Sequence, residues 1–169
     1  MFFNPESIRG CLVHASRIGY YQGVSATYEV STDPDRFDID LIHRLLHATY
    51  WARNMPRQLL EKSIRHSLCF GVYSGGAQVA FARVITDLAT FAYLSDVIVV
   101  PEHRGRGVCK LLMRAILAHS ELQGLRRFVL ATRDAHGLYA QFGFKPLPAP
   151  EEYMTIHNEN AYAAVEDLR

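Results

Sequence analysis

The sequence predicts a single α/β domain in which a mixed sheet is flanked by helices. Stretches whose apolar residues recur at helical spacing alternate along the chain with short apolar runs that are bounded by turn residues. The chain has 169 residues, of which 49% are hydrophobic, and this is enough for one domain with a buried core. No internal repeat interrupts the order of these segments.

Charge and cysteine content argue against several classes of protein. Lys and Arg number 18 against 17 Asp and Glu, a net charge of +1, which is too balanced for binding nucleic acid through overall charge. Cys11, Cys69 and Cys109 are widely spaced and fit reduced thiols better than a disulfide framework or a zinc site. The apolar runs are too short to span a bilayer, and the first residues lack the order of a signal peptide. We therefore expect a cytoplasmic protein that binds neither nucleic acid nor membranes.

The first half of the chain predicts a strand followed by two helices. Residues 1–25 have no clean period and are interpreted as an N-terminal extension that holds a short helix and an extra strand. Alternation over residues 26–32 predicts a strand. Residues 38–51 carry an apolar helical stripe with Asp38 placed to cap it, and a shorter helix is expected over residues 55–67.

The second half changes to the period of strands. Two apolar runs flank Gly75 and Gly76 and predict a hairpin. Residues 90–100 are apolar almost throughout, which is typical of a central strand covered on both faces. The remaining elements are expected in the order helix, strand, short helix and two closing strands, over residues 108–123, 125–132, 134–142, 143–147 and 152–157.

The turn before the helix at residue 108 combines bare backbone with positive charge. The first N–H groups of a helix have no partner, and the helix dipole adds partial positive charge there. Gly105 and Gly107 let a bulky anion approach these groups, while Arg104, Arg106 and Lys110 add whole charges. The combination suits a pyrophosphate. The alternative is a glycine-rich turn that only lets the helix pack closely.

Two familiar phosphate motifs do not match this turn. The pattern GxxxxGK[ST] of a P-loop is absent, and no acidic residue closes a second strand as a dinucleotide fingerprint requires. The segment VIVVPEHRGRGVCKLLM instead resembles the signature segment of the GNAT superfamily, the CoA-dependent N-acetyltransferases. Their pattern is Arg or Gln, two residues, Gly, one residue, then Gly or Ala. Arg104 and Gly107 match the first two fixed positions of this pattern, and Cys109 stands at the last one, which it does not match.

A second segment strengthens this resemblance. AHGLYAQFGF is similar to the closing helix and strand of the family, with a tyrosine shortly before Gly-Phe, and the order of elements agrees from about residue 26 to the end. Two positions depart from the family pattern. Cys109 replaces a smaller residue in the turn, and Thr132 stands where many members carry an asparagine near the cofactor.

The resemblance implies a GNAT-like domain over residues 26–169, with a mostly antiparallel sheet that splays at a central strand. It also implies acetyl-CoA as co-substrate. The pantetheine arm would lie in the splay like an added strand, against the backbone of Val97, Ile98 and Val99. The phosphates would bind the turn, where the expected contacts are Arg104, Gly105, Arg106, Gly107, Val108, Cys109 and Lys110.

Two residues are candidates for proton transfer. By its place in the motif, Tyr139 would protonate the departing CoA thiolate, although the ring could also pack in the core. Asp96 lies within an apolar run and is the candidate base that takes the proton of the amine. Alternatively, its carboxylate binds backbone N–H groups where the strands part. Asp87, Tyr93 and His136 are reserve candidates.

Two further groups of residues have a structural and a functional interpretation. His43 and His47 are four apart on a helix, but no third ligand completes a metal site, so we expect a solvated or partly packed pair and no metal. Tyr50 and Trp51 follow that helix. In this family they would border the acceptor side, but Trp51 could equally anchor the core.

The leading hypothesis is an N-acetyltransferase that moves an acetyl group from acetyl-CoA to a primary amine by direct attack in a ternary complex. The alternative is a non-catalytic CoA-binding or regulatory module of the same fold. The presence of both Tyr139 and Asp96 favours catalysis. The amine is expected on a small molecule or a protein, and its identity, the length of the acyl group and the formation of a homodimer are left open.

Overall fold

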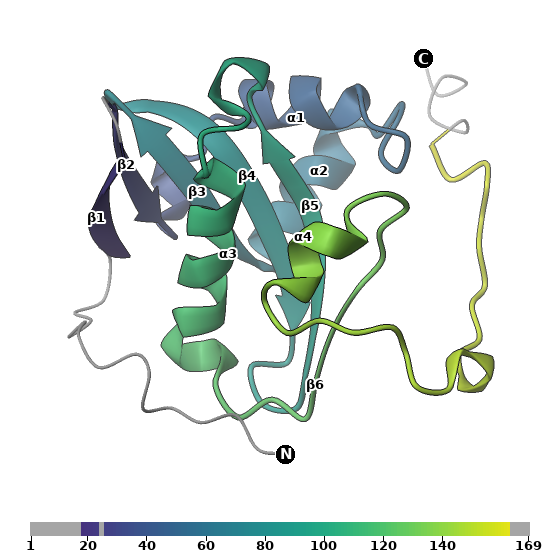
Figure 1. Ribbon diagram of the computed structural model, residues 1–169. Coiled ribbons are helices and arrows are strands. Elements are labelled where there is room, and N and C mark those ends of the chain that lie inside the picture. The colour runs from purple at the N-terminus through teal and green to yellow at the C-terminus, as the bar shows by residue number, and fades with distance from the viewer. Residues whose placement is uncertain (1–17, 24–25, 163–169) are drawn as a thin grey trace, which may run out of the picture.

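The computed structural model describes residues 18–23 and 26–162, and one six-stranded sheet forms their centre (Figure 1). The strands follow the sheet in chain order, and every neighbouring pair is antiparallel except β5 and β6, which are parallel. Their bounds are β1 Ile18–Gly23, β2 Ala26–Ser31, β3 Leu68–Ser74, β4 Ala77–Thr86, β5 Phe91–Val99 and β6 Arg127–Leu130. The predicted α/β class with a mixed, mostly antiparallel sheet is confirmed.

Helices cover both faces of the sheet. α1 (Ile39–His47) and α2 (Arg57–Arg65) lie behind it in Figure 1 and share one apolar cluster with it. α3 (Val108–Ala118) lies in front and supplies much of a second cluster. The short α4 (His136–Ala140) follows β6. No helix of residues 18–23 and 26–162 is long and apolar enough to cross a membrane.

Local sequence accounts for where these elements begin and turn. The Asp38 carboxylate accepts the Leu41 N–H at 2.9 Å, which is the predicted N-cap of α1. Gly75 and Gly76 have φ values of 58° and 85° and form the predicted β3–β4 hairpin, because this left-handed backbone favours glycine. The extra strand expected near the N-terminus is β1, which pairs with β2. Residues 1–17, where the short helix was expected, lie outside the described residues.

The two closing strands expected over residues 143–147 and 152–157 do not form, and this prediction was wrong. Pro146, Pro148 and Pro150 remove three backbone donors from the segment, which disfavours a strand. The chain instead leaves the sheet after α4 and runs beside the body of the molecule (Figure 1). Within the described residues, β6 is therefore an edge strand.

Candidate active site between β5 and β6

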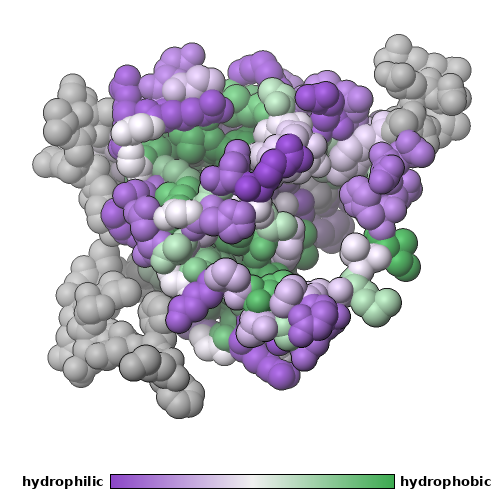
Figure 2. Space-filling model, turned by 45° about the vertical axis from the view of Figure 1, so that its right-hand side comes forward, coloured by the Kyte–Doolittle hydropathy of each residue, from purple (hydrophilic) through white to green (hydrophobic). Residues whose placement is uncertain are grey.

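A cleft opens where β5 and β6 stop pairing. The two strands pair from Phe91 opposite Arg127 to Leu94 opposite Leu130, after which β6 ends and β5 continues to Val99. A cavity of about 430 Å³ lies beyond the last pair, within the size range of small-molecule sites. Hydrophobic residues lie in hollows on this side of the molecule, with hydrophilic residues around them (Figure 2). The expected splay at a central strand is thus present.

A β-bulge in β5 forms one wall of this cleft. The register against β4 shifts by one residue between two pairs, Phe81↔Ile98 and Arg83↔Ser95. Asp96 and Val97 therefore stand together opposite Ala82. Asp96 has a φ of 55°, in the left-handed region that residues other than glycine rarely adopt.

The bulge decides which backbone groups of β5 face the cleft. The Val100 N–H donates to Val79 O of β4 at 2.9 Å. Because antiparallel strands alternate the direction of their backbone groups, those of Ile98 also point to β4, and those of Val97 and Val99 point to the cleft. The expected cofactor contacts at Val97 and Val99 therefore fit the geometry, whereas the Ile98 backbone faces away from the cleft.

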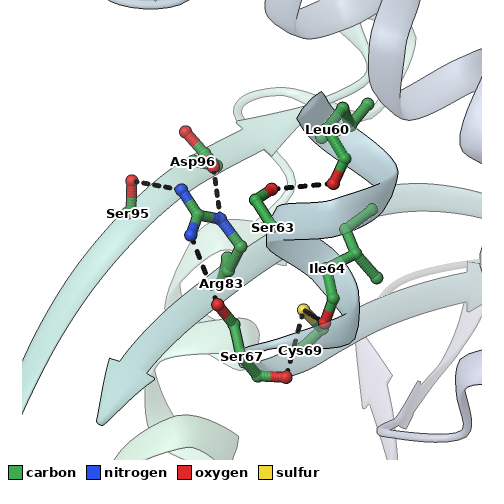
Figure 3. Close-up of polar contacts among 8 residues, drawn as sticks. All are labelled: Leu60, Ser63, Ile64, Ser67, Cys69, Arg83, Ser95 and Asp96. Atoms are coloured by element: carbon green, nitrogen blue, oxygen red, sulfur yellow. Dashed lines mark hydrogen bonds and ion pairs between the residues drawn. The ribbon is translucent and has the colours of Figure 1, made fainter. Parts of the chain in front are cut away.

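The Asp96 side chain lines the cleft but is not free. Its Oδ2 accepts a hydrogen bond from Arg83 Nε (Figure 3) at a distance of 2.7 Å. The Asp96 side chain is 3% exposed and the Arg83 side chain 10%. The alternative weighed for this carboxylate was binding to backbone N–H groups, and the partner is instead an arginine of the neighbouring strand. Sequence reasoning missed Arg83, although a charged residue within the apolar run QVAFARVIT was a usable signal.

Tyr139 lies on α4 and lines the same cavity. Burial raises the pKa of its phenol to about 12, so the hydroxyl keeps its proton at neutral pH. Its ring also contacts the Phe144 ring, with centroids 6.0 Å apart. The packing and proton-donor interpretations of Tyr139 are therefore compatible.

The glycine turn forms a second cavity of about 330 Å³ next to the first. Gly105 and Gly107 have φ values of 72° and 80°, and a Cβ at either position would meet no atom within 4 Å. Leu111 N–H is the first to bond within α3, to Gly107 O at 2.9 Å, so the N–H groups before it have no helical acceptor. This open, N–H-rich turn can receive an anion.

Charged and apolar side chains complete the turn and join it to the cleft. Arg104 Nε donates to Val99 O at 3.0 Å, which brings this guanidinium to the end of β5. Arg106 and Lys110 are exposed. Cys109 lines both cavities, and burial raises the pKa of its thiol, so it is an uncharged wall residue at neutral pH. A ligand that follows this wall would reach from the turn to Tyr139.

An aromatic contact crosses the mouth of the cleft. Tyr50 and Trp51, from the α1–α2 loop, contact each other with centroids 4.8 Å apart and line the larger cavity. The Arg133 guanidinium lies 3.9 Å from the Tyr50 ring centroid, and the Arg133 N–H donates to the Tyr50 hydroxyl at 3.3 Å. Trp51 is 44% exposed, which favours its interpretation as a border of the acceptor side over a core anchor.

The reserve candidates lie in three different settings. Tyr93 lines the larger cavity, whereas His136 lines a separate groove along β6. Asp87 caps the β4–β5 hairpin by accepting the Thr90 hydroxyl and the Thr90 and Phe91 N–H groups. These hydrogen bonds, with that of the Thr90 hydroxyl the strongest, hold the pKa of Asp87 far below its ordinary value. Asp87 therefore has a structural role in the hairpin.

The histidine pair on α1 has a structural explanation too. His43 Nε2 lies 2.8 Å from Met55 O, and the His43 and His47 rings contact each other with centroids 5.8 Å apart. Among the residues that the structure describes, no group of three His, Cys, Asp or Glu could hold a metal ion.

Known proteins are similar to this chain in sequence and in fold. The model of the Acetyltransferase (GNAT) family matches residues 38–144, a range that contains every lining residue of both cavities. The chain belongs to the GNAT acetyltransferase family. Acetyltransferases of this family use acetyl-CoA as the acyl donor.

Individual relatives agree with the family assignment. The Gibberella zeae protein "Putative acetyltransferase FG08082" is 34% identical over 137 residues, which are 68% of this chain and 76% of that protein. A crystal structure from Xanthomonas campestris pv. campestris, of a "putative acetyltransferase belonging to the gnat family", is 57% identical with a TM-score of 0.78, covering 80% of this chain and 96% of that one. A Clostridium acetobutylicum "predicted acetyltransferase with acetyl-CoA" is alike in fold, with a TM-score of 0.57 at 12% identity over 78% and 96% of the two chains.

Proposed function

We propose that this GNAT acetyltransferase moves an acetyl group from acetyl-CoA to a primary amine of a small molecule or a protein. The observation that carries the proposal is the continuous cleft between β5 and β6. It joins the open, N–H-rich turn to a partly buried, protonated phenol, since Val99, Cys109 and Leu138 line both cavities. An anionic cofactor held at the turn would thus extend its acyl end towards Tyr139.

The cofactor has suitable partners along the whole cleft. The N–H groups at the start of α3 and the Arg106 and Lys110 charges suit its phosphates. The cleft edge of β5 suits its pantetheine amides, because an extended chain can add to an open strand edge through backbone hydrogen bonds. Arg104 already occupies Val99 O, so the Val97 groups and the Val99 N–H remain for the arm.

The acetyl transfer would proceed in one direct attack. The lone pair of the neutral amine nitrogen forms a bond to the thioester carbon, and the carbonyl oxygen becomes an oxyanion. The Val97 N–H, which faces the cleft, would stabilise that charge. The nitrogen, cationic after the attack, then gives up one proton, and the electron pair of the oxyanion re-forms the carbonyl as the carbon–sulfur bond breaks. The sulfur leaves with the electron pair of that bond and takes the Tyr139 proton. Tyr139 would regain a proton from solvent after product release.

The amine must lose a proton for each turnover, and Asp96 is our candidate to receive it. Its carboxylate is buried and lies on the cleft wall. Arg83 Nε binds Oδ2, which leaves Oδ1 to accept the proton directly or through water. The Tyr50, Trp51 and Arg133 contact at the mouth would then border the path by which the amine enters.

A panel of amines tests this function against the non-catalytic alternative. The protein is incubated with acetyl-CoA and amines that range from polyamines to amino acids and lysine peptides, with thiol release and product mass as readouts. We expect CoA release that depends on one class of amine and a product heavier by one acetyl group. Binding of acetyl-CoA by calorimetry without transfer to any amine would instead support a CoA-binding module.

A further inference from the structure

Arg83 reaches three partners from one buried position on β4. Its Nε donates to Asp96 Oδ2 at 2.7 Å, while Nη1 donates to Ser67 Oγ at 3.3 Å and Nη2 to Ser95 Oγ at 3.4 Å (Figure 3). The guanidinium is planar and rigid, so three bonds, two to β5 and one to the turn before β3, fix its orientation. Ser95 and Asp96 are consecutive residues, and both of their side chains turn to the same guanidinium.

Consecutive residues of a regular strand point to opposite faces of the sheet, so this shared partner depends on the bulge. Asp96 is the bulge residue in the left-handed conformation, a position that glycine commonly occupies. A residue with a Cβ is strained there unless its surroundings hold it, although aspartate tolerates this conformation better than most. The Arg83 bond is the side-chain contact that holds Asp96 within the described residues.

We infer that Arg83 is a positioning residue, which holds Asp96 in the left-handed bulge and so turns the Val97 backbone into the cleft. Without the bulge, the register of β5 beyond residue 95 would shift by one, and the Val97 groups would point to β4. The use of the bulge for binding acetyl-CoA rests on the proposed function. The dependence of the bulge on Arg83 does not.

Asp96→Gly separates the bulge from the carboxylate. Glycine adopts a positive φ without strain, so it should keep the bulge even when no side chain is held. Arg83→Leu alone leaves a buried carboxylate without its partner, which is strongly destabilising and could prevent folding. The double variant Arg83→Leu/Asp96→Gly removes both charges and should fold, which keeps the test decisive.

The experiment measures acetyl-CoA affinity by calorimetry in the full chain, with folding checked by circular dichroism. Arg83→Leu should weaken binding about tenfold or more, the worth of one or two backbone hydrogen bonds. The double variant should return to within about threefold of the wild type, because the glycine restores the bulge. Turnover is not the readout, since Asp96 is itself the candidate proton acceptor.

Arg36→Leu is the matched control. Arg36 forms a two-pronged ion pair with Glu29 of β2, at 2.7 and 3.2 Å, on the same sheet but outside both cavities. Its loss should leave acetyl-CoA affinity unchanged. If the Arg83 pair were only a structural ion pair of this kind, the folded Arg83 variants would bind acetyl-CoA as the wild type does, and the inference would be overturned.

Two further outcomes decide the inference. A folded double variant that still binds weakly would show that Arg83 acts other than through Asp96, and this would also overturn it. If even the wild type bound no acetyl-CoA, the proposed function would fail, and the inference would be judged by stability. The effects of Arg83→Leu and Asp96→Gly on the unfolding equilibrium constant should then be coupled by about tenfold or more. Additive effects would refute the dependence of the bulge on Arg83.

Discussion

The glycine turn and the β5 bulge use left-handed backbone in opposite ways. In the turn, Gly105 and Gly107 adopt positive φ without a side chain, and the space beside them is open. In the bulge, Asp96 adopts it with a side chain that is bound from the neighbouring strand by Arg83. The turn carries its conformation in its own sequence, whereas the bulge depends on a residue of another strand.

The charges of the two regions differ in the same way. Arg106 and Lys110 in the turn are exposed, whereas Arg83 and Asp96 are buried and paired with each other. Exposed charges contribute little to the stability of the fold and remain available to bind an anionic ligand. Removing one of two buried, paired groups leaves the other charge without its partner and destabilises the fold. Substitutions in the turn should therefore lower acetyl-CoA affinity, whereas those of Tyr139 and Asp96 in the cleft should lower turnover.

The largest effect is expected from Tyr139→Phe, which removes only a hydroxyl from the cleft. If the phenol protonates the thiolate, turnover should fall by roughly 10²–10⁴, the usual worth of general acid catalysis. Acetyl-CoA affinity should hold, because the proton transfer belongs to the transition state. Single-turnover kinetics with calorimetry would measure both. Full activity of the variant, with chemistry rate-limiting, would reduce Tyr139 to a packing residue.

The pH dependence of the wild type sharpens this prediction. Burial raises the pKa of Tyr139 to about 12, so the phenol is fully protonated at neutral pH and loses its proton only as the pH rises towards that value. Turnover should therefore not decline as the pH rises through about 10, where an ordinary tyrosine titrates. A decline near 10 that disappears in Tyr139→Phe would show that the phenol titrates as an exposed one.

Asp96→Asn should also separate turnover from affinity. Asparagine tolerates the left-handed conformation and keeps an oxygen for Arg83 Nε, so the bulge and acetyl-CoA affinity should hold. The amine would lose its proton acceptor, and turnover near neutral pH should fall about 10²-fold. Unchanged turnover of the folded variant would assign proton removal to water.

Substitutions in the turn should show the reverse behaviour. Arg104→Ala removes a charge beside the free N–H groups and should weaken acetyl-CoA binding by roughly 1.5–3 kcal/mol, the range for hydrogen bonds to charged groups. Turnover at saturating acetyl-CoA should change little. Arg104 also holds Val99 O, so Arg106→Ala, which lacks such a contact among the described residues, is the control for charge alone. Unchanged affinity in the double alanine variant would exclude the turn as the phosphate site.

The sequence predicted those parts of the fold that local signals specify. The Asp38 cap, the Gly75–Gly76 hairpin and the helix after Gly107 all depend on residues next to them. The prediction of two closing strands failed, because the alternation of apolar and polar residues over 152–157 does not determine whether a neighbouring strand is available for pairing. Three prolines just before that segment further disfavour strand pairing.

The candidate site likewise has parts that local sequence predicts and parts that depend on residues far apart in the chain. The turn and Tyr139 were found from short motifs, because their residues are neighbours in sequence as well as in space. Arg83 and Asp96 are thirteen residues apart on two strands, and their pairing depends on the β4–β5 register. The Tyr50–Arg133 contact spans 83 positions and depends on how the cleft closes. Neither contact follows from any local pattern.

The smallest effect on acetyl-CoA affinity is expected from Gly107→Ala, which tests whether a ligand occupies the open space beside Gly107. Gly107→Ala forces a side chain onto a φ of 80°, and Gly76→Ala in the β3–β4 hairpin does the same at a φ of 85°. Neither Cβ would meet another atom within 4 Å, so both variants should lose a similar amount of stability, about 1 kcal/mol, or about 2–4 °C in Tm.

The two variants should differ only in acetyl-CoA binding. The methyl group that Gly107→Ala introduces would lie where a ligand approaches the first N–H groups of α3. It should weaken acetyl-CoA affinity by several fold, about 1 kcal/mol. Gly76 lines neither cavity, so its variant should bind as the wild type does. Thermal unfolding and calorimetry on the pair thus separate backbone strain from ligand contact. Equal affinity in both variants would mean that the glycine at 107 serves the turn alone and that no phosphate comes close to it.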